Sequence, residues 1–207
     1  MLDLVKDESY KVDSRFLEPA CENGNFLVAI LERKLETVDK KHNANQDDFG
    51  KYVFIAVSSI YAIDIQEDNC EESRERMFSM ITQVYKDNYP ESLNETAENP
   101  FLDSVRHVLN TNVILGDRLT GLRVDGSGLE IVFSEYSFEG EKLIKKDFVM
   151  NDMISHEERK KTNEKVAKTG LFGMVENKKV EEELQPRKTV IYDNFKEVIN
   201  IKQSTTN

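Results

Sequence analysis

Cysteine, histidine and proline are scarce in this sequence, and long apolar runs are missing altogether. Two cysteines without a CxxC pair, and three histidines among 207 residues, predict neither a disulfide framework nor a metal site. The first ten residues, MLDLVKDESY, contain no apolar run behind a basic start, so no secretory signal is visible. No segment is apolar over a length that would span a bilayer. We therefore expect a protein of the reducing cytoplasm with no membrane partner.

Positive charge is also in short supply, and its distribution along the chain is uneven. The formal net charge is −11. Residues 1–150 carry 17 Lys and Arg against 29 Asp and Glu, whereas residues 151–207 carry 11 against 10. Nucleic-acid binding draws heavily on Lys and Arg that neutralise phosphates. The acidic first part is therefore a poor candidate to bind DNA alone, and a partner chain or the last part must supply positive charge.

Segments that predict strands alternate with segments that predict helices over most of the chain. Apolar side chains recur at three- and four-residue spacing from Asn25 to Lys41, which predicts an amphipathic helix. This alternation is typical of an α/β fold in which helices cover both faces of a parallel sheet. Strands are expected at 14–20, 60–65 and 112–117. Besides the helix over 25–41, helices are expected directly before residue 60, over 67–86 and over 99–111.

The pattern changes after Gly121. The runs LEIVFSEYSF and KLIKKDFVM, joined through EGE, predict a two-stranded hairpin. From about Ile154 the chain becomes highly charged and is expected to be largely helical. We predict two parts, a ligand-binding domain over residues 1–150 and a charged tail or docking element over residues 151–207. Tyr192 and Phe195 are expected to anchor this tail, either to the body or to a partner.

Three predicted parallel strands each end in an acid, at Glu18, Asp64 and Asp117. Open α/β sheets bind ligands in the crevice outside the carboxyl ends of their strands. An acid after the second strand can accept both hydroxyl hydrogens of a ribose, and one after the third can accept from the amino group of adenine. Each acid can equally cap the helix or turn that follows it.

The turn after the first strand decides between two adenosine-bearing cofactors. A dinucleotide fingerprint has the form GxGxxG, with the ribose-binding acid about 20 residues further on. Here the turn holds only Gly24, and Asp64 lies 40 residues after it. The dinucleotide interpretation is therefore weak, and S-adenosylmethionine is the better candidate.

The motifs themselves resemble a known family. The stretch RFLEPACENGNFL is similar to the first cofactor motif, E-P-A-C-G-x-G-N-F-L, of the amino-group-directed DNA methyltransferases of restriction–modification systems. IYAIDIQEDNCEESRERM resembles the second motif, and NTNVILGDRLTG the third. Their order and spacing also match, so the resemblance covers roughly residues 1–150. It implies a Rossmann-like S-adenosylmethionine-dependent methyltransferase fold, incomplete at its start and lacking a recognisable substrate half.

The resemblance also implies roles for individual residues. Asp64 and Ile65 would flank the ribose and adenine, and Asp117 would contact the adenine. The turn that holds the cofactor would be formed by Glu18, Pro19, Ala20, Gly24, Asn25 and Phe26.

Three departures from the family pattern bear on activity. Glu22 replaces the first glycine of the turn and brings a carboxylate toward the methionine portion of the cofactor. The upstream Phe-Thr-Pro segment of the family is absent from this sequence. The Asn/Asp-Pro-Pro-Tyr/Phe motif, which would hold the target amine and stack on the flipped base, is also absent. Ser134, Glu135 and Tyr136 imitate it only loosely, and an ordinary strand with alternating faces explains them better.

Three functions remain open at this point. The first is a component of a DNA-modification system that binds S-adenosylmethionine, with an adenine or cytosine amino group as target and DNA reached through a partner chain. The second is a degenerate methyltransferase fold that acts as a regulatory or decoy protein-binding subunit. The third is a small-molecule methyltransferase whose pocket is built by the predicted hairpin.

Overall fold

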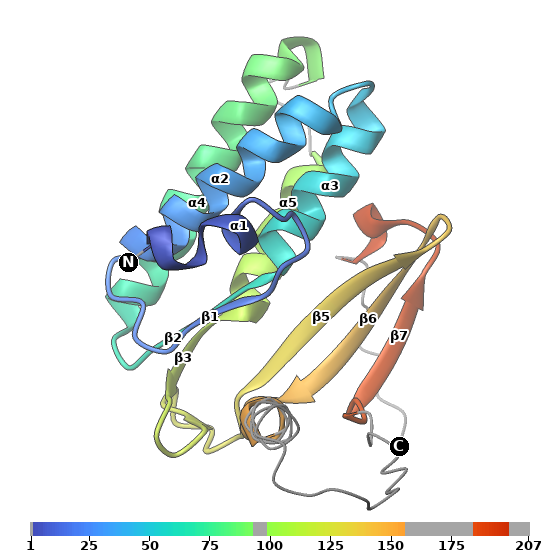
Figure 1. Cartoon of the computed structure of the whole chain (residues 1–207). Coiled ribbons are helices and arrows are strands. Elements are labelled where there is room, and N and C mark those ends of the chain that lie inside the picture. Colours follow the sequence, from blue (N-terminus) through green and yellow to red (C-terminus); the bar gives the residue numbers. More distant parts are fainter. Residues whose placement is uncertain (1, 93–98, 156–183, 199–207) are drawn as a thin grey trace, which may run out of the picture.

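The computed structural model describes residues 2–92, 99–155 and 184–198. Within these ranges the chain is a mixed α/β structure with a parallel sheet, a separate antiparallel sheet and a layer of helices (Figure 1). The elements of the first half are a 3-10 helix at Leu2–Val5, α1 (Lys6–Ser9), β1 (Phe16–Glu18), α2 (Asn25–Lys41), α3 (Gln46–Ser58), β2 (Ile60–Asp64) and α4 (Glu67–Asn88). Those of the second half are a 3-10 helix at Pro90–Ser92, α5 (Pro100–Asn112), β3 (Val113–Asp117), β4 (Leu122–Arg123), β5 (Val132–Glu139), β6 (Lys142–Val149), β7 (Lys188–Tyr192) and a 3-10 helix at Phe195–Glu197.

The first sheet has the strand order β1-β2-β3-β4. The strands β1, β2 and β3 are parallel, and β4 is a two-residue antiparallel addition at the edge. The alternation of strands and helices that the sequence predicts is confirmed for this half of the chain. The order also matches one half of a doubly wound sheet, in which the first strand would lie beside the second half.

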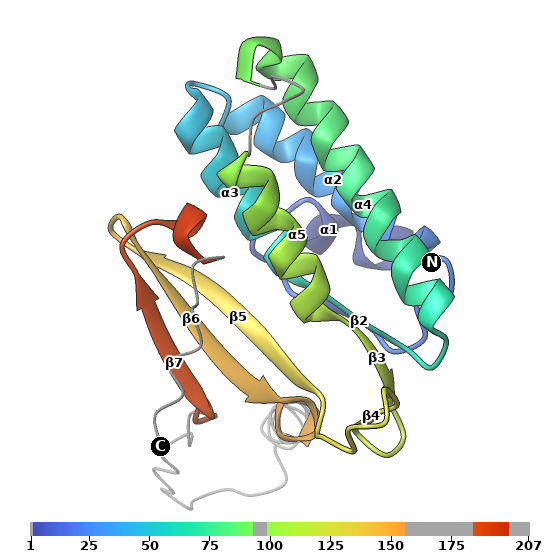
Figure 2. The ribbon, with the colours of Figure 1, turned by 180° about the vertical axis from the view of Figure 1, so that it is seen from behind.

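Helices cover one face of this sheet, as the sequence predicts. The side chains of Ile60 and Ala62 point from β2 into the large core that α2, α3, α4 and α5 share. Figure 2 shows these four helices as one layer on the same side of the strands.

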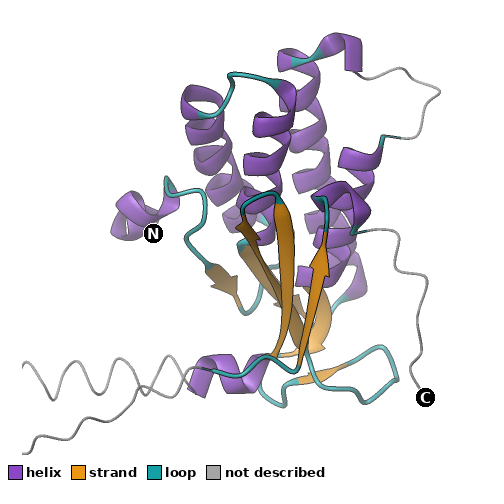
Figure 3. Cartoon of the chain, turned by 90° about the vertical axis from the view of Figure 1, so that its right-hand side faces the viewer, coloured by secondary structure: helices purple, strands orange, loops and turns teal. Residues whose placement is uncertain are grey.

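The other face is covered differently from the prediction. The alternate side chains of β2, Tyr61 and Ile63, form a smaller core with Ile131, Phe133 and Met150. These partners belong to β5 and its flanks and to the helix that begins at residue 150. Figure 3 shows the strands gathered below the layer of helices. Helices thus cover the first face, whereas the second face is covered by β5 and its flanks together with the short helix that begins at residue 150, so the expectation of helices on both faces is only partly correct.

The second sheet has the order β5-β6-β7 and is antiparallel throughout. The hairpin β5–β6 confirms the prediction, with Gly140 at a φ of +62° in its turn. Strand β7 comes from the predicted tail and pairs with β6, and the side chains of Tyr192 and Phe195 are buried in the large core. These two residues thus dock on the body of the chain, and β7 is a strand where a helical tail was expected. Residues 156–183, within the charged part that the sequence predicts to be largely helical, lie outside the described residues, and the boundary at residue 150 stays a prediction.

One buried cation joins three parts of the helical layer. Lys34 lies in the middle of the apolar stripe of α2, and its side chain is fully buried. Its Nζ donates to the backbone oxygens of Lys11, Val12 and Ser14 at 3.2, 2.9 and 2.6 Å, and to Ser59 Oγ at 2.6 Å. Because these oxygens belong to the segment before β1 and to the residue after α3, a single ammonium fixes both to α2.

The same position perturbs the proton affinity of this lysine. Burial lowers the pKa of Lys34 to about 7, and the nearby carboxylates of Asp13 and Glu8 limit the fall because they favour the charged form. In the unfolded chain the pKa is about 10.5. Between pH 7 and 10.5 the unfolded state therefore binds more protons at this site than the folded state does, so the stability rises with pH in that window.

We predict a pH-dependent difference in stability between the parent protein and Lys34→Met. The parent free energy of unfolding, minus that of the variant, should rise between pH 7 and pH 10 by up to about 1.4 kcal/mol per pH unit. Urea denaturation at several pH values measures it. Lys41→Met, an exposed change in the same helix, should give a difference that does not vary with pH. A flat difference for Lys34→Met would show that the four oxygens keep the amine protonated throughout.

Candidate functional site

The carboxyl ends of β1, β2 and β3 lie at the same edge of the parallel sheet, and each ends in the acid that the sequence predicts. The strand register staggers these acids. Glu18 lies opposite Ala62, two residues before Asp64, and Asp64 lies opposite Leu115, two residues before Asp117. The three carboxylates therefore follow an inclined line along the edge and do not converge on one point.

Asp64 is the most constrained of the three. Its side chain is only 8% exposed. Oδ2 accepts from the backbone N–H of Glu22 at 2.9 Å, and Oδ1 accepts from the backbone N–H of Gln66 at 3.0 Å and from Asn69 Nδ2 at 3.1 Å. The bond to Glu22 joins β2 to the turn after β1, and the other two fix the entry into α4. Asp64 does not cap α4, whose N-cap is Gln66, but it fixes the residues that lead into the helix and holds the turn after β1 in place.

The turn itself is packed tightly between β2 and α4. Cys21 N–H donates to the carbonyl of Ile63 at 3.1 Å, and the hydroxyl of Ser73 donates to the carbonyl of Glu22 at 3.1 Å. Arg76 donates to the carbonyl of Asn23. Bonds from both neighbouring elements therefore fix the path of the turn, which leaves its backbone little freedom.

Two residues of the turn have left-handed backbones. Gly24 has a φ of +79° and Glu22 a φ of +47°. A Cβ on Gly24 would lie 2.7 Å from Ser73 Oγ and 3.0 Å from Ser73 Cα, so glycine is required there for space as well as for conformation. Glu22, in contrast, has a φ that glycine adopts more easily, and its side chain is exposed. The carboxylate that replaces the family's glycine therefore points to solvent and leaves the packed turn undisturbed.

The other predicted site residues lie around this turn with different exposures. Pro19, Ala20 and Asn25 are exposed, while Glu18 and Phe26 are half-buried. Glu18 Oε1 accepts a hydrogen bond from the backbone N–H of Ala20, in the turn that follows β1. Ile65 stands directly after Asp64 with 65% of its surface exposed, which is unusual for a large apolar side chain.

Asp117 supports a turn of its own. Its carboxylate accepts from the N–H of Leu119 at 2.8 Å and from the hydroxyl of Thr120 at 3.1 Å. This is the local capping that short acidic side chains provide in turns. Among the three acids, then, only Asp64 bonds to a second segment of the chain, and the structure places Asp117 near the edge without linking it to Asp64.

The two cysteines lie side by side beneath the turn. Both are free and buried, and Ser73 contacts Cys21 Sγ at 3.7 Å. The hydrogen bond with Cys70, together with burial, raises the pKa of the Cys21 thiol. Cys21 is therefore a small packing residue and is poorly suited to act as a nucleophile. The described residues include no group of three or more His, Cys, Asp or Glu that would hold a metal ion.

The imitation of the catalytic motif at residues 134–136 is an ordinary strand. Ser134 is buried and its hydroxyl donates to Asp147 at 2.6 Å. Glu135 points to the other face, where it pairs with Arg15. Tyr136 returns to the first face and packs edge-on against Phe54, with ring centroids 5.2 Å apart. Because neighbouring side chains of a strand point in opposite directions, these three residues do not meet around one substrate.

A niche beside this strand is small. It has a volume of about 70 Å³, and its lining includes Arg15, Tyr61 and Glu135. Pockets for drug-sized ligands measure roughly 300–1,000 Å³. The hairpin therefore builds no cavity here that would hold a methyl donor and a small substrate together, which weighs against the third of the open functions.

Comparison of the chain with models of protein families, with curated proteins and with solved structures finds no match. The described helices include none that combines the length and the apolar character needed to cross a bilayer.

One residue that the sequence does not single out, Asn112 at the end of α5, joins the helical layer to the second sheet. The buried side chain of Asn112 accepts from the N–H of Ser134 at 3.0 Å through Oδ1, and its Nδ2 donates to the carbonyls of Ser134 and Ser58 at 2.9 and 3.2 Å. It therefore pairs with the free edge of β5 as a neighbouring strand would. A single Asn within the apolar end of a helix gives no sequence signal for this role.

We predict that Gly24→Ala destabilises the protein more than Gly126→Ala does. Both glycines have a φ near +80°, so both variants carry the cost of a left-handed alanine, about 1 kcal/mol. Only at Gly24 does the new Cβ meet the backbone of α4, since the position next to Gly126 is open. Thermal unfolding of both variants measures the difference. Equal losses would show that the turn moves away from Ser73 without cost.

We also predict that Asn112→Ala lowers the free energy of unfolding by about 3 kcal/mol, since it leaves three buried backbone groups without partners. The matched control is Asn110→Ala, an exposed position in the same helix, which should leave the stability unchanged or slightly higher. Chemical denaturation measures both. A loss below about 1 kcal/mol for Asn112→Ala would mean that water or a neighbouring group replaces the amide.

Proposed function

We propose that this chain is the S-adenosylmethionine-binding component of a DNA-modification system of the restriction–modification type, in the cytoplasm. The observation that carries the proposal is the arrangement at one sheet edge: the turn with Gly24, the strand-end acid Asp64 and the turn of Asp117 follow three parallel strands. Ligands of open α/β sheets bind at this kind of edge. The resemblance of the three motifs supports the same assignment.

The start of α2 adds a second favourable feature. Its N-cap is Gly24, and no side chain caps the first helical amides. Free amides at a helix N-terminus attract negative charge, so they suit the carboxylate of a methionine group. The exposed Ile65 offers an apolar surface for adenine at the neighbouring strand end. The carboxylate of Asp64 is less available to a ligand, because it already accepts three hydrogen bonds within the protein. We therefore assign Asp64 the role of holding the turn, and Ile65 and the helix start the role of contacting the cofactor.

The bound cofactor would supply an electrophilic methyl group on a sulfonium. That methyl group would pass in line to an adenine or cytosine amine, whose proton would go to solvent. No covalent intermediate with the protein is required. Because Ser134, Glu135 and Tyr136 diverge, the groups that hold the target amine belong in this proposal to a second chain. That chain would also supply the positive charge for DNA.

A protein-binding subunit that has lost the cofactor is the alternative. The observation in its favour is that Asp64, the expected ribose ligand, is buried and engaged in the turn. This function requires no affinity for S-adenosylmethionine, so a binding measurement separates the two.

We predict that calorimetric titration of S-adenosylmethionine into the full chain gives micromolar affinity, about −8 kcal/mol. Ile65→Glu should weaken the affinity at least tenfold, because it places a carboxylate against the adenine. The matched control is Ile191→Glu on β7, where the isoleucine is 60% exposed, and it should leave the affinity unchanged. Absence of heat with millimolar cofactor would reject the proposal and favour the protein-binding subunit.

A further inference from the structure

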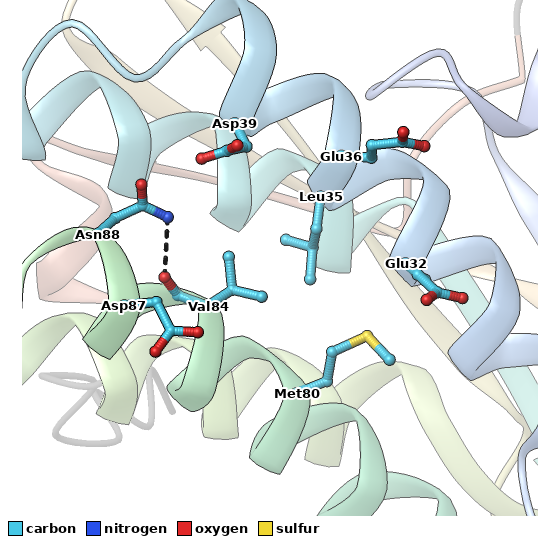
Figure 4. Close-up of a pocket in the computed structure, with 8 residues that line it drawn as sticks. All are labelled: Glu32, Leu35, Glu36, Asp39, Met80, Val84, Asp87 and Asn88. Carbon is cyan, nitrogen blue, oxygen red and sulfur yellow. Dashed lines mark hydrogen bonds between the residues drawn. The ribbon is translucent and has the colours of Figure 1, made fainter.

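A groove runs between α2 and α4, in the part of both helices that lies far from the Gly24 turn (Figure 4). Its volume is about 470 Å³. Apolar side chains from both helices, Leu35, Met80 and Val84, line its middle. The other lining residues are polar or acidic: Glu32, Glu36, Asp39, Asp87 and Asn88.

The lining carries four carboxylates and no cationic side chain. Among the described residues, Glu36 pairs with the exposed Lys40 at 2.6 Å, and Lys40 also interacts electrostatically with Asp39. Asp39 and Asp87 accept hydrogen bonds from neutral amides, those of Asn43 and Gln83. Neutral donors leave the charge of a carboxylate in place, so the groove combines an apolar middle with a strongly negative rim.

Two of these acids lie at the C-terminal ends of their helices. Asp39 lies in the last turn of α2, and Asp87 lies in the last turn of α4. A helix C-terminus carries a partial negative charge, so an acid there is unfavourable for the helix and a cation is favourable. The same last turns also contain Lys40, Lys41 and Lys86, which complement the helix dipoles. This end of the groove therefore contributes the two carboxylates of its lining.

We propose that this groove binds a basic amphipathic helix of a partner protein. The lining spans residues 32–39 of α2 and 80–88 of α4, about 10–12 Å at the helical rise, which equals two turns of a docked helix. Helix-in-groove recognition places apolar side chains at i, i+3 or i+4, and i+7. Here one or two such side chains would contact Met80 and Val84, and flanking Lys or Arg side chains would reach the carboxylates. A second copy of this chain, with a net charge of −11, is a poor occupant.

The test uses a synthetic probe on the full chain. The probe is an 18-residue peptide of leucine and lysine, with leucines at i, i+3, i+4 and i+7, and its counterpart carries glutamate in place of lysine. The lysine peptide should bind, with NMR shift changes confined to α2 and α4 around the groove, and the affinity should fall as salt increases. The glutamate peptide should not bind.

Variants separate the groove from the general acidity of the protein. The triple variant Glu32→Gln, Asp39→Asn, Asp87→Asn should weaken lysine-peptide binding at least tenfold. A matched triple variant outside the groove removes the same charge from exposed positions at the start of α4: Glu67→Gln, Asp68→Asn and Glu71→Gln. It should change the affinity less than twofold. Met80→Asp should also abolish binding, because it places a charge in the apolar middle.

Three outcomes would overturn the proposal. Equal losses in both triple variants would mean that the peptide follows net charge alone. Binding of spermidine at the groove with higher affinity than the lysine peptide would assign it to small polycations. A dimer in sedimentation that Met80→Asp dissociates would assign the groove to contact between two copies of the chain.

Discussion

The helical layer depends on one buried amine, whose hydrogen-bond partners among the described residues are neutral oxygens. The Nζ of Lys34 lies within hydrogen-bond distance of three backbone oxygens and one hydroxyl, and these acceptors belong to parts of the chain that are distant in sequence. Without the Lys34 side chain, the carbonyls of residues 11, 12 and 14 would face an apolar helix, and buried carbonyls without donors are costly. The path of the chain into β1, and therefore the position of the turn after it, follows from where this one side chain can reach.

At the strand ends, the buried side chain of Asp64 fixes a segment distant in sequence, as Lys34 does in the helical layer. A carboxylate at the end of the middle strand is well placed to bind a ligand, and for the same reason it is well placed to accept from the backbone of the neighbouring turn. In this chain Asp64 accepts from the backbone N–H groups of neighbouring residues in this way. The sheet edge therefore combines a rigid, fully bonded centre with exposed contacts on either side, at Ile65 and at the start of α2. In the proposed cofactor site, affinity would therefore depend on contacts around the acid more than on the acid itself.

Much of the fold follows from periodicity in the sequence. The bounds of α2, the pairing of β5 with β6 and the three strand-end acids are as the residue pattern predicts, because each depends on local spacing. The covering of the second sheet face does not follow in this way. It depends on where the chain after Gly121 returns, and a hairpin has the same local pattern whether it packs beside a sheet or across it. The hydrogen-bond partners of Asp64 and Asn112 cannot be predicted from the sequence either, since the identity of a polar residue does not show which backbone groups lie next to it in the fold. Lys34 did leave a signal: it stands between Ile30 and Val38 on the buried stripe, four residues from each.

The side chain of Asn112 has a consequence beyond joining the helices α3 and α5 to the second sheet. Strand β5 lies at the edge of its sheet, and an edge strand with open N–H and C=O groups is a template on which another chain can add a strand. Asn112 occupies both groups of Ser134, so an incoming strand would meet a side chain where it needs backbone partners. A single amide side chain thus protects this part of β5 against association, in a strand that also carries the acids Glu135 and Glu139.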